Sequence, residues 1–134
     1  MTTSVISATY SALANDSTLM ALAPGGAHTT WSTEGELPRI LLGYSFTRDT
    51  TLMRVGALDV DVFYHGNDVE SGELIRDRVI QLIENRYFRT DETGRTLRAT
   101  LGTDAIVRED DPQIGHWSMS FDIRFFRREV MSNG

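Results

Sequence analysis

The sequence contains no cysteine and no lysine, and all 13 basic residues among its 134 are arginine. The lack of cysteine excludes disulfide frameworks, thiol nucleophiles and cysteine-based zinc sites. A chain of 15.0 kDa buries roughly two-thirds of its unfolded surface on folding, so it needs no such cross-links to be stable. We therefore expect one domain spanning residues 1–134.

Long apolar runs are also missing. No stretch approaches the roughly 20 apolar residues that cross a bilayer, and the N-terminus lacks a basic segment followed by an apolar run. We expect a protein made in a cytoplasm, without membrane contact. The formal net charge of −6 argues against general nucleic-acid binding, because Lys and Arg provide the affinity for phosphate backbones. The all-arginine usage suits bidentate contacts with carboxylates at protein interfaces, and genome composition explains it equally well.

The clearest structural signal is an alternation near the C-terminus. Apolar and polar residues alternate there. The apolar set is Trp117, Met119, Phe121, Ile123 and Phe125, and the polar set is His116, Ser118, Ser120, Asp122 and Arg124. A period of two indicates a strand with one buried and one wet face. Because it carries so many aromatic side chains, we expect this last strand to be central to the core.

Other segments alternate between helical and strand periods. Helical spacing predicts a first helix over residues 4–14 and a short turn over 16–22 that ends before the Pro24-Gly25-Gly26 loop. Strands are predicted at 28–31, 39–46 and 52–64, with 47–51 as a hairpin tip.

A second helix is predicted from Ser71, which is a plausible N-cap. Its apolar stripe consists of Leu74, Ile75, Val79, Leu82 and Ile83. Strands at 97–101 and 105–108 and a turn at 110–112 follow. The order favours an α+β fold, in which a mainly antiparallel sheet of about four to five strands is covered by the N-terminal helix and this principal amphipathic helix.

The sequence offers few candidates for chemistry. Asp59 and Asp61 share a strand face, as paired carboxylates or a hard-cation site require, although a solvated strand face explains them better. His28, His65 and His116 form neither an i, i+4 pair nor an HExxH motif, which favours structural or surface roles. We predict no catalytic residue, no metal site and no cofactor.

One local concentration of positive charge stands out in this acidic chain: Arg86, Arg89, Arg95 and Arg98. It is interpreted as a docking loop for an acidic protein surface or for nucleic acid passing nearby. The alternative, a solvated loop whose charge is balanced by Asp91, Glu92 and Asp104, explains the cluster better.

The order of these segments resembles small tail-completion proteins of tailed bacteriophages, also called tail-terminator or tail-to-head joining proteins. The resemblance covers about residues 5–127. Its matching features are Ala12, Leu13, Asn15, Asp16 and Leu19 in the N-terminal region, Leu22 before the glycine-rich loop, Leu37-Pro38 leading into 40–43, the strand 58–64, the break 66–71, the helix 74–83 and the late strand 117–126.

This resemblance implies a structural, non-enzymatic role in the virion. Several copies, commonly six, would form a ring at the head-proximal end of the tail, stop growth of the tail tube and join the tail to the head connector. The implied partners are further copies, the tail tube protein and the connector or neck protein, with assembly in the bacterial host cytoplasm. DNA would pass through the channel without specific binding.

A ring requires two different patches on each subunit. The candidate interface residues are Arg48, Asp49 and Arg54 at the hairpin, the arginines Arg86, Arg89, Arg95 and Arg98, and the acidic Asp59 and Asp61, with Asp68 as a further acidic contact. Three alternatives stay open: a head-completion or neck ring protein, a small α+β enzyme or ligand-binding protein that uses Asp59 or Asp61, and a regulatory or toxin-neutralising interaction module.

Overall fold

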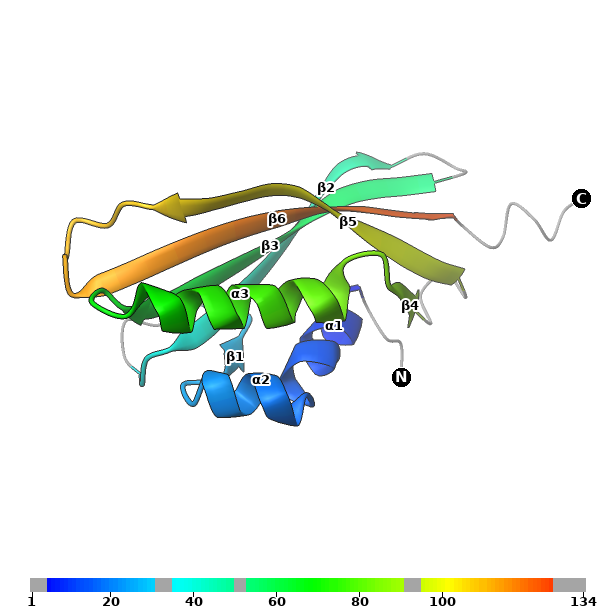
Figure 1. Cartoon of the computed structure of the whole chain (residues 1–134). Coiled ribbons are helices and arrows are strands. Elements are labelled where there is room, and N and C mark those ends of the chain that lie inside the picture. The colour runs from blue at the N-terminus through cyan, green and yellow to red at the C-terminus, as the bar shows by residue number, and fades with distance from the viewer. Residues whose placement is uncertain (1–4, 31–34, 50–52, 91–94, 127–134) are drawn as a thin grey trace, which may run out of the picture.

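A computed structural model describes residues 5–30, 35–49, 53–90 and 95–126, which form three helices and six strands (Figure 1). The predicted α+β class is confirmed. In chain order the elements are α1 (Val5–Ala14), α2 (Ser17–Leu22), β1 (Ala27–His28), β2 (Arg39–Asp49), β3 (Met53–His65), α3 (Val69–Ile83), β4 (Tyr87–Thr90), β5 (Arg95–Val107) and β6 (Ile114–Phe126).

The strands form one sheet in the order β1-β2-β3-β6-β5-β4. All neighbouring strands are antiparallel except β1 and β2, which run parallel. The last strand, β6, lies in the middle of the sheet between β3 and β5, and its apolar face belongs to the core, as predicted. Two of the six strands are short, because β1 has two residues and β4 has four.

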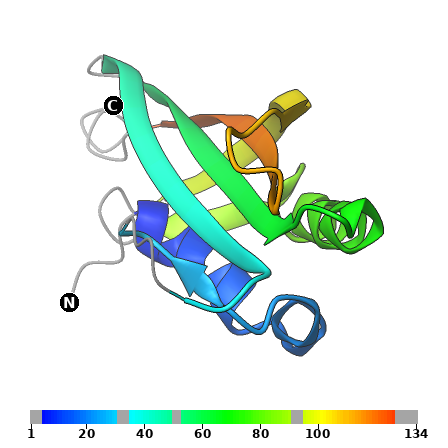
Figure 2. The same cartoon turned by 90° about the vertical axis from the view of Figure 1, so that its left-hand side faces the viewer.

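All three helices lie on the same side of the twisted sheet (Figures 1 and 2). Strand alternation sends every second side chain to that covered face. The residues that meet there include three fully buried ones from each of β3, β6 and α3: Leu58, Val60, Val62, Met119, Phe121, Ile123, Ile75, Val79 and Ile83. These side chains form the centre of the core.

The sheet packs closely against α3 around one aromatic ring. Tyr64 of β3 is 1% exposed, and it lies between Gly72 of α3 and Gly115 of β6. A Cβ at Gly72 would be 2.6 Å from the Tyr64 ring, and one at Gly115 would be 2.1 Å from it. Glycine at both positions therefore makes room for the tyrosine, even though glycine weakens a helix interior.

The start of α3 differs from the prediction. The helix begins at Val69, and its N-cap is Asp68, whose carboxylate accepts a hydrogen bond from the Ser71 backbone N–H at 3.2 Å. The predicted cap, Ser71, lies inside the first turn. The predicted apolar stripe is wrong at Leu74, whose side chain is 50% exposed, because it lies outside the arc of Ile75, Val79 and Ile83 that contacts the sheet.

The two predicted strands 97–101 and 105–108 are one strand, β5. Its register with β6 shifts between Leu101 and Thr103, so Gly102 is a bulge rather than a chain break. The remaining differences are small. Strand β2 continues through Thr47, Arg48 and Asp49 of the predicted hairpin tip, and β1 covers only Ala27 and His28. The rest of that tip, the predicted strand end at Trp31, and Asp91 and Glu92 lie outside the described residues.

Candidate assembly interface

The sheet brings the predicted hairpin and arginine loop together at one end. Five residues there lie opposite one another in five adjacent strands: Arg48 of β2, Val55 of β3, Arg124 of β6, Arg98 of β5 and Tyr87 of β4. In the same region the strand register places Asp49 opposite Arg54, Arg89 opposite Thr96, and Arg95 opposite Thr90.

We call this region the basic end of the sheet. It contains the strand positions of Arg48, Arg54, Arg89 and Arg95 and the exposed side chains of Arg86, Arg98 and Arg124. The prediction missed Arg124, although its place in the alternation of β6 already put it on the wet face. Among the residues that the structure describes, the aspartates in this region are Asp49 and Asp122.

Local hydrogen bonds orient two of the exposed arginines. The Arg86 Nε donates to the Gln81 carbonyl oxygen at 3.2 Å, and the Arg98 Nη2 donates to the Asn85 Oδ1 at 2.9 Å. Arg98 and Arg124 also line a shallow hollow of about 290 Å³ with Thr100 and Asp122. These guanidinium groups remain accessible to a partner.

Asp104 does not balance these arginines, contrary to the alternative interpretation of the loop. Its carboxylate accepts hydrogen bonds from Arg76 of α3 and, at 2.6 Å, from the Trp117 Nε1 of β6. Arg76, followed by Trp117, holds the pKa of Asp104 below its ordinary value against the effect of burial. This network joins α3 to β5 and β6.

Asp59 and Asp61 share the uncovered face, as predicted, but their surroundings differ. Asp59 is exposed, whereas the Asp61 Oδ1 accepts a hydrogen bond from the His116 Nε2 at 2.7 Å. The other ring nitrogen of His116 donates to the Glu109 Oε1 at 2.6 Å. The imidazole also stacks on Phe63, with ring centroids 4.4 Å apart.

The geometry of His116 fits an electrostatic cross-link. Both ring nitrogens donate only in the protonated imidazole, so contacts to two carboxylates favour the imidazolium form. Asp61 and then Glu109 raise the pKa of His116, and burial opposes this. Both ring nitrogens of His116 are engaged by carboxylates, which fixes the orientation of the imidazole. The cluster ties β3 to β6 and to the segment that follows β5.

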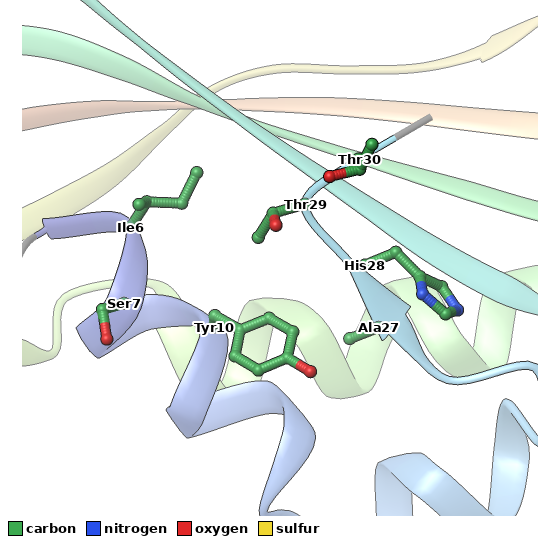
Figure 3. A pocket seen from close by; sticks show the side chains of 7 residues that line it. All are labelled: Ile6, Ser7, Tyr10, Ala27, His28, Thr29 and Thr30. Atoms are coloured by element: carbon green, nitrogen blue, oxygen red, sulfur yellow. The ribbon is translucent and has the colours of Figure 1, made fainter. Parts of the chain in front are cut away.

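A second hollow, between α1 and β1, has fewer polar contacts than the His116 cluster. It has a volume of about 420 Å³ and is lined by Ile6, Ser7, Tyr10, Ala27, His28, Thr29 and Thr30 (Figure 3). The His28 Nε2 is used locally, 2.7 Å from the Gly25 carbonyl oxygen. In the part of the chain that the structure describes, no three His, Asp or Glu residues are arranged to hold a metal ion.

No helix within the described ranges is long and apolar enough to cross a membrane.

The fold resembles solved structures, although no protein-family model and no curated protein sequence matches the chain. One similar chain comes from the virion of a native gene transfer agent particle. It has a TM-score of 0.77 and 15% sequence identity, over 91% of this chain and 94% of that one. A second, known only by a sequence identifier, has a TM-score of 0.59 and 18% identity, over 90% and 94% of the two chains. These likenesses establish a shared fold over nearly the whole chain.

Proposed function

We propose that this protein is a structural component of a phage-like virion. In the proposal, several copies, by family analogy six, form a ring at the head-proximal end of the tail. The ring stops growth of the tail tube and joins the tail to the head connector. The observation that carries the proposal is the fold shared with a chain of a gene transfer agent virion, at a TM-score of 0.77.

The position at the tail end rests on the resemblance to tail-completion proteins in the order of elements. Two physical features support an assembly role. Arginine positions from five strands and from the segment after α3 gather at one end of the sheet. The exposed side chains of Arg86, Arg98 and Arg124 form an accessible patch there for a partner. The most organised polar cluster on the uncovered face, around His116, uses both ring nitrogens in contacts to Asp61 and Glu109, which join β3, β6 and the segment after β5.

Acidic surface charge also suits the proposed channel. The net charge of −6 disfavours lasting contact between a ring of such subunits and DNA that passes through it, because like charges repel. In this proposal the DNA is cargo and not a bound partner.

The proposal is tested by adding the purified protein to growing tail tubes from the particle encoded by the same genome. We expect added protein to shorten the tubes in proportion to its concentration and to sediment with their ends. Unchanged tube lengths, together with binding to isolated head connectors, would favour a head-completion role instead. No binding to tubes or connectors would contradict the proposed function.

A further inference from the structure

The far part of β5 is an open sheet edge. The near part is covered: β4 pairs with Arg95–Arg98, the Asn85 N–H donates to the Ala99 carbonyl oxygen at 2.8 Å, and the Glu84 carboxylate accepts from the Leu101 N–H at 3.0 Å. From Thr103 to Val107 the strand is paired with β6 alone among the described strands. An uncovered edge of this kind is a template for association.

Apolar side chains gather at this open edge. Ile106 is 57% exposed and Val107 is 38% exposed, and across from them Val69 at the start of α3 is 46% exposed. All three line one hollow of about 550 Å³, together with residues of the β5–β6 connection. Such a local grouping of exposed aliphatic side chains is typical of an interaction surface.

Acidic side chains border this hollow. Glu73 lies one helical turn after Val69, so it is on the same side of α3, and Asp110 lines the hollow directly. Both are exposed. Arg108, Glu109 and His116 also line the hollow, and Glu109 is hydrogen-bonded to His116. Glu70 lies in the first turn of α3, next to Val69. We define the β5 edge surface as Val69, Glu73, Ile106, Val107 and Asp110.

The β5 edge surface and the basic end lie at opposite ends of the same sheet. Val107 is paired with His116 and Arg98 with Arg124, and eight residues of strand span about 26 Å. The two patches therefore do not meet within one molecule. One is acidic around an apolar centre, and the other is rich in exposed arginine.

We propose that the β5 edge surface receives the basic end of a second copy of this chain. The inference rests on the proposed ring and names its contact: acidic patch to basic patch, repeated head to tail around the ring. A heterologous contact of this type joins two different patches and closes into a ring when the rotation allows. The charge complementarity sets the orientation of the subunits, and burial of Ile106 and Val107 supplies apolar contact area.

Paired charge reversals test this contact. One variant carries Glu73→Arg and Asp110→Arg, and the other carries Arg98→Glu and Arg124→Glu. Neither set includes a group of the His116 cluster or of the core. Self-association is measured by light scattering at low salt and by electron microscopy of rings at tail tube ends, with circular dichroism as the folding control. We expect each variant alone to associate at least tenfold more weakly than the native chain, and an equimolar mixture of the two to recover assembly.

A matched pair of apolar substitutions tests the centre of the surface. Ile106→Asp should reduce ring formation, whereas Leu74→Asp, at a similarly exposed position on α3 outside the surface, should not. If Ile106→Asp and both charge-reversed variants form rings like the native chain, the inference fails while the proposed function stands. If the native chain forms no ring either alone or on tubes, the inference and the ring-forming role both fail.

Discussion

The two faces of the sheet are built from the same strands but differ in burial and in polarity. Toward the helices, β3 and β6 present aliphatic and aromatic side chains that are fully buried, among them Val60, Met119 and Phe121. Away from the helices, the alternate residues include exposed Asp59, Asp122 and Arg124. One face determines the fold, and the other leaves the sheet free to meet partners.

Because of this difference, substitutions can be chosen that change either the stability of the fold or the association of subunits. Substitutions on the covered face should change the free energy of unfolding, because they open cavities or create clashes in a close-packed interior. Substitutions on the open face and at the ends of the sheet should leave folding nearly unchanged and alter association instead.

The largest expected effect is the loss of a central core side chain. Phe121→Ala removes a fully buried ring and should lower the free energy of unfolding by about 3–5 kcal/mol. The neighbouring Ser120→Ala, on the open face, should change it by less than about 0.5 kcal/mol. Urea denaturation of both variants measures the difference. Equal losses at the two positions would contradict the assignment of the faces.

The next effect concerns the glycines around Tyr64. Gly72→Ala and Gly115→Ala each place a methyl group against the buried ring, so each should destabilise the protein by about 1–3 kcal/mol. At Gly72 the sign of the change in the free energy of unfolding is informative, because alanine in a helix interior normally stabilises the helix relative to glycine. Gly43→Ala is the control, since a Cβ there meets nothing within 4 Å. Thermal unfolding that ranks Gly43→Ala as the most harmful of the three would refute this packing.

A smaller effect is expected where α2 is fixed to α3. The Asp16 carboxylate caps α2 by accepting from the Leu19 N–H at 2.8 Å, and it also pairs with Arg78 of α3. Asp16→Ala should cost about 1 kcal/mol through the lost cap alone. Arg78, followed by the Leu19 N–H, lowers the pKa of Asp16 against the effect of burial. This part of the stability should therefore be present above the ordinary carboxyl pKa and be lost as the pH falls through the lowered value.

The smallest effect is a pH dependence on the open face. The pKa of His116 is raised in the folded protein by Asp61 and Glu109, so the folded state binds this proton more tightly than the unfolded state does. The associated stability is complete below the ordinary histidine pKa and disappears as the pH rises through the raised value. We expect at most about 1 kcal/mol, because the cluster is only partly buried. His116→Gln should flatten the stability profile in this range, and an unaltered profile would show that the ion pairs contribute nothing measurable.

Local sequence patterns predicted most of the fold, because each depends on residues close together in the chain. The alternation around Phe121 predicted β6 and its place in the core, and the helical spacing around Val79 predicted α3. The errors arose where the same residue type is compatible with two local structures. Two strands, 97–101 and 105–108, were predicted where one strand contains a bulge at Gly102. Ser71 was predicted as the helix cap, whereas Asp68, three residues earlier, is the cap.

The candidate interface was predictable only in part. The hairpin and arginine-loop positions were selected by sequence, but their meeting at one end of the sheet depends on the register of four strand pairs. Arg124 joins them through that register. The His116 cluster was missed because Asp61 is 55 residues away in sequence, and no local pattern links the two. Sequence reasoning also had no signal for the open edge at Ile106, since strand order decides which strand is uncovered.

The most direct test of the central claim is cryo-electron microscopy of tail tubes assembled with this protein. The account predicts a closed ring of several copies at one end of each tube, with the basic end of every copy against the β5 edge surface of the next. Density for the protein along the tube wall, or tube ends that carry no copy of it, would contradict the account.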